Sequence, residues 1–411
     1  MGSKRVPEVR FKGFSEEWEE KKLRELASFA KGNGYSKSDL IEEGEPIILY
    51  GRLYTKYQTV IEKVDTFTKI KEKSLISKGY EVIVPSSGET SEDISRASVV
   101  KRSGVILGGD LNVIYPSDEI NSIFLALTIS NGNQQKELSK KAQGKSVVHL
   151  HNSDLKEVNL YYPKKEEQVQ IGNFFKQLDE TIAIQQQELD TLKQTKQGFL
   201  QKMFPKEGES LPEIRFPGFS GEWERQKFKN LAKVRRGLTY TPISIRQNGV
   251  RVLRSSNICD DTFVIGNDDV FVNPKAINID FVKENDILIT AANGSSRLVG
   301  KHALIKNVGK DAVHGGFMLV ATAKIPLFIN AMMSSTWYKK FINVHVSGGN
   351  GAIGNLNKNA LEEQTVYVPQ IEEQKMIGNF FGKLDNTIAL QQQELENLKQ
   401  TKKAFLQKMF V

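Results

Sequence analysis

Two glycine-containing segments are the best candidates for phosphate or nucleotide chemistry. Gly144-Lys145-Ser146 resembles the end of a phosphate-binding loop, but position 139, where that loop requires a glycine, holds a serine. Gly32-Asn33-Gly34 lacks the third glycine of a dinucleotide-binding fingerprint, because Lys37 stands at that place. The Asn/Asp-Pro-Pro-aromatic tetrapeptide of amino-methyltransferases does not occur in the sequence. These patterns predict no catalytic residue in this chain.

Histidine and cysteine are scarce, which limits metal and nucleophile chemistry. His149 and His151 could ligate a metal, but the sequence places no third ligand nearby. The single cysteine, Cys259, excludes a disulfide framework within the chain and a multi-cysteine zinc site. No activating motif surrounds it, so we interpret it as a small filler residue. The sequence therefore predicts no metal and no cofactor bound by this chain.

The composition is that of an ordinary soluble protein. The chain has 411 residues, of which 39% are hydrophobic and 26% charged, and its net charge is +8. The length suggests two or three domains. The longest apolar runs, such as 317–321, are far shorter than a membrane helix, and the N-terminus lacks the apolar core of a signal peptide. We therefore expect a cytoplasmic protein.

The chain is an internal duplication. Pro7-Glu8-Val9-Arg10-Phe11 recurs as Pro212-Glu213-Ile214-Arg215-Phe216, an offset of 205. Residues 163–204 recur as residues 369–410 with 30 identities in 42 positions. The segments between these copies match poorly. We call residues 1–162 the first head and residues 205–368 the second head; residues 163–204 and 369–411 are the two repeated regions.

Each repeated region reads as one long helix. Between 166 and 203 there is no proline, and apolar residues recur at alternating steps of three and four, which predicts a coiled-coil seam. The apolar members of the seam are Leu178, Ile182, Leu189, Leu192 and Phe199, with Leu384, Ile388, Leu395, Leu398 and Phe405 in the second copy. The seam turns polar at Gln185 and Lys196, and again at Gln391 and Lys402, which is typical of positions that set register.

The two helices are expected to pair antiparallel. Thirty-eight residues make a rod of roughly 57 Å, and an antiparallel pair would place the heads at opposite ends, related by a pseudo-twofold axis. A second set of apolar residues lies off the seam: Phe174, Ile184, Leu200, Phe380, Leu390 and Leu406. These residues either dock helices of a partner protein or pack against the chain's own heads.

Both heads read as mixed α/β domains with short strands. We predict strands at 47–50, 81–84, 104–107 and 112–115 and one helix at 118–138 in the first head. The second head repeats this pattern with strands at 250–253, 286–289, 301–305 and 318–322 and a helix at 329–341. The repeated regions carry almost no net charge, so a charge of about +7 lies on the heads and their connectors, which favours nucleic acid as a ligand.

This organisation resembles the DNA-specificity subunit of type I restriction–modification systems. The resemblance rests on the Pro-x-x-x-Glu-Gln signatures at Pro163–Gln168 and Pro369–Gln374, each at the entry to a long helix, and on Trp18 and Trp223 in their Gly-Phe-Ser-x-Glu-Trp settings. It implies two α/β target-recognition domains joined by an antiparallel coiled coil. Each domain would read one half of an asymmetric, bipartite target in double-stranded DNA.

The resemblance also implies that other subunits carry the chemistry. Two modification subunits would dock on the helices, bring S-adenosylmethionine and methylate adenine N6. Restriction subunits would hydrolyse ATP, with Mg, and cut DNA. This chain would be a non-catalytic subunit. A two-headed coiled-coil adaptor that binds proteins without DNA specificity remains an alternative, as does a self-sufficient enzyme.

Candidate DNA contacts are polar or aromatic residues in the loops of the heads, because base edges and phosphates are read by such side chains. In the first head they are Tyr35, Lys37, Tyr50, Arg52, Tyr54, Ser86, Ser87, Lys145 and Ser146. In the second head they are Thr239, Tyr240, Arg254, Ser255, Asn257, Asn293, Ser295, Arg297 and Asn350. Each of these residues could also be a solvated loop residue.

Overall fold

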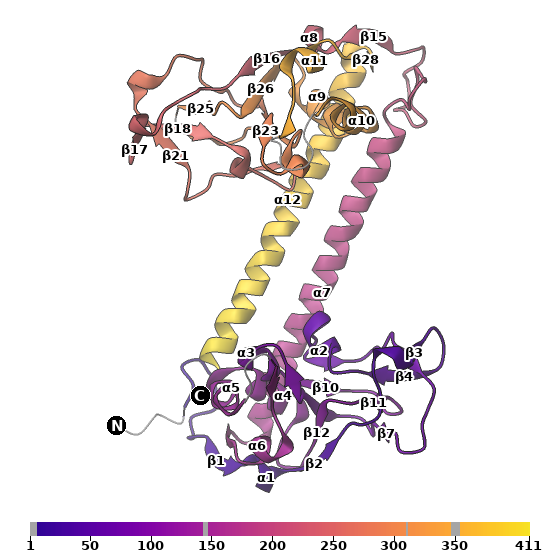
Figure 1. Ribbon diagram of the computed structural model, residues 1–411, viewed down its shortest axis with the longest axis vertical. Coiled ribbons are helices and arrows are strands. Elements are labelled where there is room, and N and C mark those ends of the chain that lie inside the picture. The colour runs from indigo at the N-terminus through magenta and orange to yellow at the C-terminus, as the bar shows by residue number, and fades with distance from the viewer. Residues whose placement is uncertain (1–5, 143–146, 310, 347–353) are drawn as a thin grey trace. The chain divides into compact units, whose positions relative to one another are not determined.

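The computed structural model describes residues 6–142, 147–309, 311–346 and 354–411. The chain forms two compact units, one made of residues 1–186 and 394–411 and the other of residues 187–393. Each unit contains one head and part of both long helices (Figure 1). In the described part of the chain, no helix is both long and apolar enough to cross a membrane.

The first head is built on two five-stranded sheets. The larger one has the order β2 (Ala27–Lys31), β12 (Leu111–Pro116), β8 (Glu81–Pro85), β10 (Ser98–Val100), β5 (Val60–Ile61). The other has the order β3 (Leu40–Ile41), β6 (Phe67–Thr68), β4 (Glu45–Ile48), β11 (Ile106–Leu107), β7 (Leu75–Ile76). Two small pairs join β1 (Glu19–Lys22) to β14 (Asn159–Tyr162) and β9 (Ser87–Gly88) to β13 (Val148–His149). The helices are α1 (Leu23–Leu26), α2 (Arg52–Thr55), α3 (Ser91–Ile94), α4 (Ser122–Ser130), α5 (Gly132–Lys141) and α6 (Asn152–Lys156).

The second head repeats this frame with four-stranded sheets. The larger one has the order β16 (Ala232–Arg236), β26 (Met318–Ala323), β22 (Ile287–Thr290), β24 (His302–Leu304). The other has the order β17 (Ile245–Arg246), β21 (Val270–Val272), β18 (Val250–Leu253), β25 (Ala312–His314). Small pairs join β15 (Glu224–Lys227) to β28 (Thr365–Val368), β19 (Ile258–Cys259) to β20 (Thr262–Phe263) and β23 (Ala292–Asn293) to β27 (Gly354–Asn355). The helices are α8 (Phe228–Leu231), α9 (Pro326–Met333), α10 (Thr336–His345) and α11 (Lys358–Glu362).

A central strand buried on both faces explains the layered packing of each head. Side chains of a strand alternate between its two faces. Val82 and Val84 of β8 therefore belong to the core under α4 and α5, whereas Ile83 belongs to the core shared with the second sheet. In β22 of the second head, Ile287 and Ile289 face the helices and Leu288 faces the other side. The sequence predicts both strands as short apolar runs, and the structure confirms them.

The predicted single helix after each head's last long strand is wrong, because two helices occupy the segment. In the first head, Asn131 stands between α4 and α5, and Gly132, the first residue of α5, adopts a φ of 70°. In the second head, Ser334 ends α9 and Ser335 begins α10, and the Ser335 hydroxyl donates to the Met332 carbonyl at 2.7 Å. Left-handed glycine and serine caps stop a helix even where the apolar periodicity continues.

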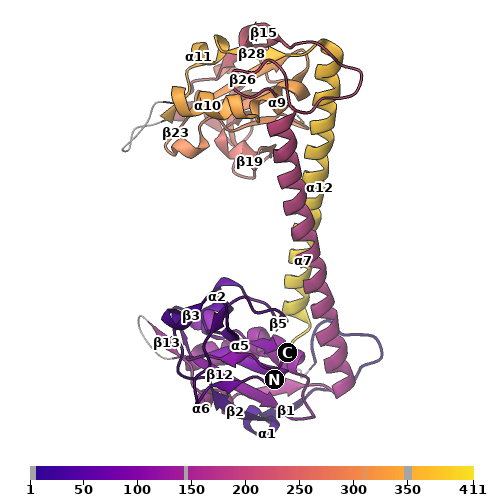
Figure 2. The same ribbon diagram turned by 90° about the vertical axis from the view of Figure 1, so that its right-hand side faces the viewer.

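The repeated regions form two 38-residue helices, α7 (Lys165–Lys202) and α12 (Ile371–Lys408). In the first unit, Phe174 of α7 packs edge-on against Phe405 of α12, with ring centroids 5.2 Å apart. In the second unit, Phe199 packs in the same way against Phe380, at 5.1 Å. Low numbers on one helix thus meet high numbers on the other, so the pairing is antiparallel as predicted. Both ribbon views show the helices alongside each other (Figures 1 and 2).

The seam follows the heptad pattern, including its polar positions. Leu189 and Leu395 are buried, and the other predicted apolar seam residues are half-buried. The lysines that interrupt the seam meet carboxylates of the opposite helix: Lys402 pairs with Asp179, and Lys196 pairs with Asp385 at 2.6 Å. Because each polar seam position has a charged partner at only one alignment, these pairs specify the register.

The Glu and Gln of the Pro-x-x-x-Glu-Gln signature bind the start of each long helix to its own head; we call this set of hydrogen bonds the latch. Glu167 is buried and accepts two hydrogen bonds from the Arg10 guanidinium, at 2.6 and 2.7 Å. Gln168 donates to the Pro163 carbonyl and accepts from the backbone N–H of Asn121, both at 2.8 Å. The second copy repeats the latch with Arg215 on Glu373, at 2.7 and 2.8 Å, and with Gln374 on Pro369. The signature therefore fixes the start of each long helix to its own head.

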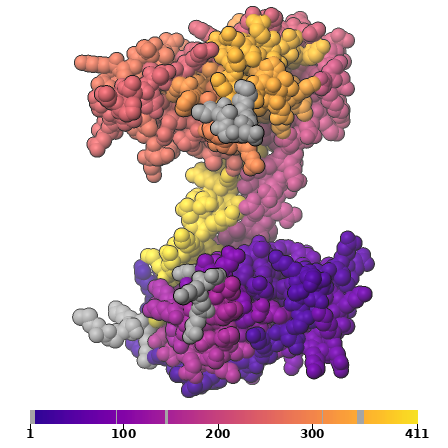
Figure 3. Space-filling model, viewed as in Figure 1, coloured from indigo at the N-terminus to yellow at the C-terminus, as the bar shows by residue number. Residues whose placement is uncertain are grey.

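The C-terminal residues complete the core of the first unit. Met409 and Phe410 are buried together with Phe124 and Phe175, and the backbone N–H of Val9 donates to the Lys408 carbonyl at 2.9 Å. In the space-filling view, the yellow C-terminal segment meets the indigo and magenta segments of this unit (Figure 3). Met203, Phe204 and Ile214 take the equivalent places in the second unit.

Candidate nucleic-acid interface

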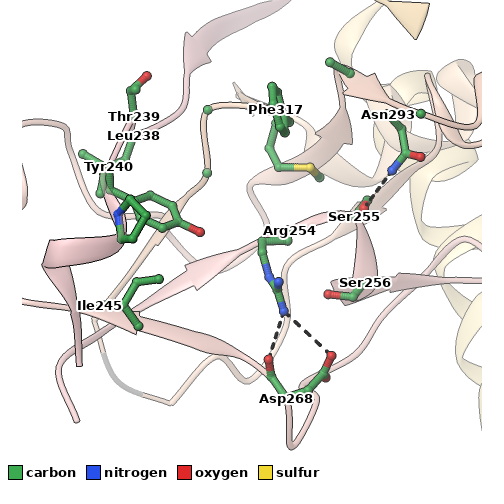
Figure 4. A pocket seen from close by; sticks show the side chains of 16 residues that line it. Leu238, Thr239, Tyr240, Ile245, Arg254, Ser255, Ser256, Asp268, Asn293 and Phe317 are labelled. Atoms are coloured by element: carbon green, nitrogen blue, oxygen red, sulfur yellow. Dashed lines mark hydrogen bonds and ion pairs between the residues drawn. The ribbon is translucent and has the colours of Figure 1, made fainter. Parts of the chain in front are cut away.

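The second head contains a pocket of about 700 Å³ between its two sheets. In Figure 4, Leu238, Thr239, Tyr240 and Ile245 lie on one side of the pocket and Ser255, Ser256 and Asn293 on the other, with Arg254 and Phe317 between them. The lining includes Leu238, Thr239, Tyr240, Ile245, Arg254, Ser255, Asp268, Asn293 and Phe317.

A tight backbone approach shapes this pocket. The backbone N–H of Leu238 donates to the His314 carbonyl at 2.7 Å. A Cβ on Gly237 would lie 1.9 Å from the Gly315 carbonyl oxygen, so only glycine fits there. In the first head, a Cβ on Gly32 would lie 2.0 Å from the Gly108 carbonyl oxygen. The repeated glycines thus bring the same strand and the same turn together in both heads.

Two polar side chains of the pocket make hydrogen bonds within the head. The Arg254 guanidinium donates to the Asp268 carbonyl at 2.9 Å and lies 3.8 Å from its carboxylate. Arg254 Nε has no partner among the described residues. The Asn293 amide donates to the Ser255 hydroxyl at 3.1 Å, and the dashed lines of Figure 4 show these contacts. The Arg254 side chain is 37% exposed although its Nε is buried, so a ligand can reach part of this side chain but not the Nε.

An exposed phenylalanine stands at the rim of the pocket. Phe317 directly follows Gly315 and Gly316, and 67% of its surface is exposed. An arginine, an asparagine and an apolar ring on one concave surface are the groups that contact guanine, adenine and the thymine methyl group in the major groove of DNA. The pocket therefore presents side-chain types that can contact base edges, and its role in reading bases stays a prediction.

The equivalent surface of the first head has different side chains. Leu111 pairs with Pro85 as Met318 pairs with Thr290, so the turn Gly108-Gly109-Asp110 corresponds to Gly315-Gly316-Phe317. An acidic residue thus replaces the phenylalanine. By the same register, Leu49 and Tyr50 stand where the second head has Arg254 and Ser255. One backbone frame presents two unlike surfaces.

The sequence matches one family model in two places. The model of the type I restriction modification DNA specificity domain covers residues 15–194 and again residues 220–400. The chain belongs to this family. The membership confirms the resemblance drawn from the two Pro-x-x-x-Glu-Gln signatures and assigns the chain to DNA specificity in a type I system.

Relatives with the same organisation extend over nearly the whole chain. The type I restriction enzyme MjaVIII specificity subunit of Methanocaldococcus jannaschii is 19% identical, over 95% of this chain and 91% of its own length. The putative MjaX specificity subunit of the same organism is 21% identical, over 95% and 92%. Both resemble this specificity chain along its full double-headed organisation.

Solved structures share the fold. The S subunit of a type I restriction-modification system from M. genitalium has a TM-score of 0.67 at 15% identity and covers 99% of both chains. A chain from a structure on complex assembly and conformational transition of the type I R-M system has a TM-score of 0.53 at 14% identity, covering 96% of this chain and 97% of its own. At these identities the likeness concerns the fold alone.

The structure brings together five of the DNA contacts predicted in the second head of this specificity chain. Thr239, Tyr240, Arg254, Ser255 and Asn293 line the one pocket. Ser295 and Arg297 are exposed on the loop after β23, and Asn350 lies outside the described residues.

Asn257 requires a correction. It is fully buried, accepts from the Arg254 backbone N–H at 2.7 Å and donates to the Asp269 carboxylate at 2.8 Å. Its polar atoms are used inside the head, so it supports the pocket wall instead of contacting a ligand.

Several predictions in the first head need the same correction. Tyr35 is buried, and its hydroxyl accepts from the Lys71 backbone N–H at 2.8 Å. The Arg52 guanidinium binds the Asp65 carboxylate at 2.6 Å and the Lys63 carbonyl at 2.9 Å. Ser86 is also buried. These side chains hold their own loops, because their polar groups already have internal partners.

The remaining first-head candidates are accessible to different degrees. Lys37 and Tyr50 are exposed. The Tyr54 hydroxyl donates to the Ser87 carbonyl at 2.7 Å, and burial raises the pKa of this phenol above its ordinary value. The Ser87 hydroxyl lies 3.2 Å from His149 Nδ1. Lys145 and Ser146 lie outside the described residues.

Four of the six off-seam apolar residues pack against their own unit. Phe174 contacts Phe11, Phe175 and Phe405, and Phe380 makes the equivalent contacts in the second unit. Leu200 and Leu406 belong to the cores of their units. Ile184 and Leu390 do not pack into either core and are 57% and 68% exposed, so the alternative of partner docking stays a prediction for these two residues.

Sequence reasoning missed Phe317 and the distinction between its turn and that of Asp110. An apolar residue directly after a Gly-Gly pair is a signal of an exposed turn tip that could have identified it. Among the described residues, no three His, Cys, Asp or Glu side chains are grouped as a metal site would need. Cys259, interpreted as a filler, is exposed.

Proposed function

We propose that this chain is the non-catalytic reader of a type I restriction–modification complex. Each head reads one half of an asymmetric, bipartite target in double-stranded DNA. The observation that carries the proposal is the equivalent turn of the two heads, which ends in Asp110 in the first and Phe317 in the second. A carboxylate accepts from cytosine N4, whereas an apolar side chain contacts the thymine methyl group. Unlike turns therefore predict unlike half-sites.

The helix pair sets the unread gap between the half-sites and binds two modification subunits. Each helix of 38 residues is roughly 57 Å long, and readers of B-DNA place their half-sites about 34 Å or a multiple apart. Ile184 and Leu390 occupy equivalent positions on α7 and α12 and remain exposed. Two equivalent apolar sites suit two copies of one partner.

The chemistry of the complex belongs to its partner subunits. The modification subunits bring S-adenosylmethionine and methylate adenine N6, and the restriction subunits hydrolyse ATP with Mg and cut DNA. The lack of a phosphate-binding loop or a methyltransferase tetrapeptide in the sequence supports this division. The assembled type I complex among the structural neighbours is in keeping with it.

Methylome sequencing tests the proposal. A host that expresses this chain with its modification subunit is compared with a host that lacks only this chain. We expect a new N6-methyladenine motif made of two unlike halves at a fixed gap. The control pairs the same modification subunit with another specificity chain to show that it is active. An active subunit that gains no new motif from this chain would contradict the DNA-reader role.

A further inference from the structure

The positive charge of the chain is concentrated in its second head. Residues 205–368 contain 21 Lys and Arg against 15 Asp and Glu, a net charge of +6. Residues 1–162 contain 24 against 23, a net charge of +1. Two heads with the same fold therefore differ widely in their attraction for a polyanion.

A second pocket of this head gathers part of that charge. It has a volume of about 560 Å³ and lies apart from the base-reading pocket, between β16, β25 and the start of α11. Its charged and polar lining residues are Lys233, Arg235, Arg236, Asn278, Asp280, His314, Lys358 and Asn359.

Two of the positively charged side chains of this pocket form no ion pair with a carboxylate of the described residues. Lys233 and Arg236 are exposed, and neither side chain has an ion pair or hydrogen bond within the part of the chain that the structure describes. Arg235 is different, because its guanidinium binds the buried Asp286 carboxylate at 2.7 Å. Lys358 pairs with Glu362 at 2.9 Å.

The other titratable groups of the pocket change this balance little. The Asp280 carboxylate lies 4.0 Å from Arg235 and is 81% exposed, so solvent screens its charge. Burial lowers the pKa of His314 to about 4, so its ring is neutral at pH 7. Lys233 and Arg236 therefore leave the pocket with positive charge available for an anion.

Within the described residues of the first head, fewer of the positions equivalent to this pocket are cationic. Ser28 pairs with Tyr115 as Lys233 pairs with Thr322, which makes Ser28 the equivalent of Lys233. Lys31 is the equivalent of Arg236, and Asn152 begins α6 as Lys358 begins α11. The Asn152 amide donates to the Ala30 carbonyl at 2.8 Å and is thereby used inside the head. Of the four positions that are cationic in the second head, one is cationic in the first head, and Lys156 of α6 lies beside the same strand with its Nζ 5.5 Å from the centre of the Phe29 ring.

We propose that this pocket binds the phosphate backbone of DNA through Lys233 and Arg236, and that the second head anchors the complex electrostatically. The inference rests on the proposed function of the chain. Arginine and lysine are the side chains that neutralise DNA phosphates, and each neutralised phosphate releases counterions and makes binding salt-dependent. The first head then contributes mainly sequence readout.

The salt dependence of DNA binding tests this inference. The full chain in complex with its modification subunits is titrated with a duplex that carries its methylation motif, over a series of salt concentrations. In the Lys233→Gln/Arg236→Gln variant, the slope of log K against log salt should become shallower by about 0.9 for each phosphate contact that is lost. The methylated motif should not change, because phosphate contacts carry no sequence information.

Two control variants make the test specific. Lys324→Gln/Lys339→Gln removes the same charge from exposed positions of the same head that do not line the pocket, and it should leave the slope unchanged. Lys233→Arg/Arg236→Lys keeps both charges and should retain the slope. Equal thermal unfolding of all variants shows that the head remains folded.

The outcomes separate the two proposals. A wild-type complex without salt-dependent DNA binding would remove the proposed function itself. Steep salt dependence that the pocket variant shares with the wild type would overturn the phosphate site alone. An equal change of slope in the pocket variant and the Lys324→Gln/Lys339→Gln control would show that only the overall charge matters and would overturn the phosphate site. Loss of the modification subunits from the pocket variant would assign the pocket to a protein partner instead.

Discussion

The two heads use the same residues to hold their frame and different residues to face a ligand. Arg10 is latched to Glu167 in the first unit, and Arg215 to Glu373 in the second. Gly32 and Gly237 bring the same strand against the same turn. The turn itself ends in Asp110 in one head and in Phe317 in the other. The backbone frame of such a head is therefore kept while the side chains on its exposed turn change.

Breaking the Arg–Glu pair of the latch should lower the free energy of unfolding more than the other changes, and by a similar amount in both units. Glu167 and Glu373 are buried. Glu167→Gln removes the carboxylate that pairs with Arg10, and Glu373→Gln removes the one that pairs with Arg215. Breaking a buried ion pair costs roughly 3–5 kcal/mol. Thermal or denaturant unfolding of the two single variants checks this, with Glu166→Gln and Glu372→Gln, exposed neighbours on the same helix turns, as matched controls. A large loss in one unit and none in the other would break the equivalence of the two frames.

Low pH should destabilise the second head more than the first head. Burial lowers the pKa of His314 to about 4, whereas an unfolded histidine has a pKa of about 6.5. The neutral ring is the form that the fold tolerates, so its stability contribution is present above pH 6.5 and is lost as the pH falls toward 4. The shift corresponds to about 3 kcal/mol. His302, also in the second head, has its pKa lowered by burial as well.

In the first head, Leu107 occupies the place of His314 and Ala97 the place of His302. Hydrogen exchange measured between pH 7 and pH 4.5 should show the second head opening first. His314→Leu, which copies the first head, should reduce the difference. Equal acid sensitivity of the two heads would contradict this prediction.

The turn residues should give the smallest effect on stability and the sharpest effect on specificity. Phe317→Ala should relax one base position in one half of the methylated motif, and Asp110→Ala should relax a position in the other half. A lost base contact is worth about 1–3 kcal/mol of discrimination. Methylome sequencing of the two variants checks both, and a change of the same half by both variants would argue against separate readers.

Local patterns predicted the long-range architecture better than the site. The alternating steps of three and four placed Leu189 and Leu395 in the seam, because a helix repeats its contacts within a few residues. Whether a polar loop side chain is free to contact a ligand depends on partners that lie far along the chain. Arg52 is used by Asp65, and Asn257 by Asp269, contacts that no spacing reveals. Phe317 escaped prediction because its exposure results from the approach of Gly237 to the turn, which only the fold creates.

The central claim, that each head reads its own half-site, can be tested with a chain that carries the first head twice. Residues 212–411 are replaced by a second copy of residues 7–204, which begins with the equivalent Pro-Glu-x-Arg-Phe segment. The methylome of a host that expresses this chain with the modification subunit is then sequenced. We expect a symmetric motif in which the first half-site occurs twice in inverted orientation. Retention of the original asymmetric motif would contradict this claim.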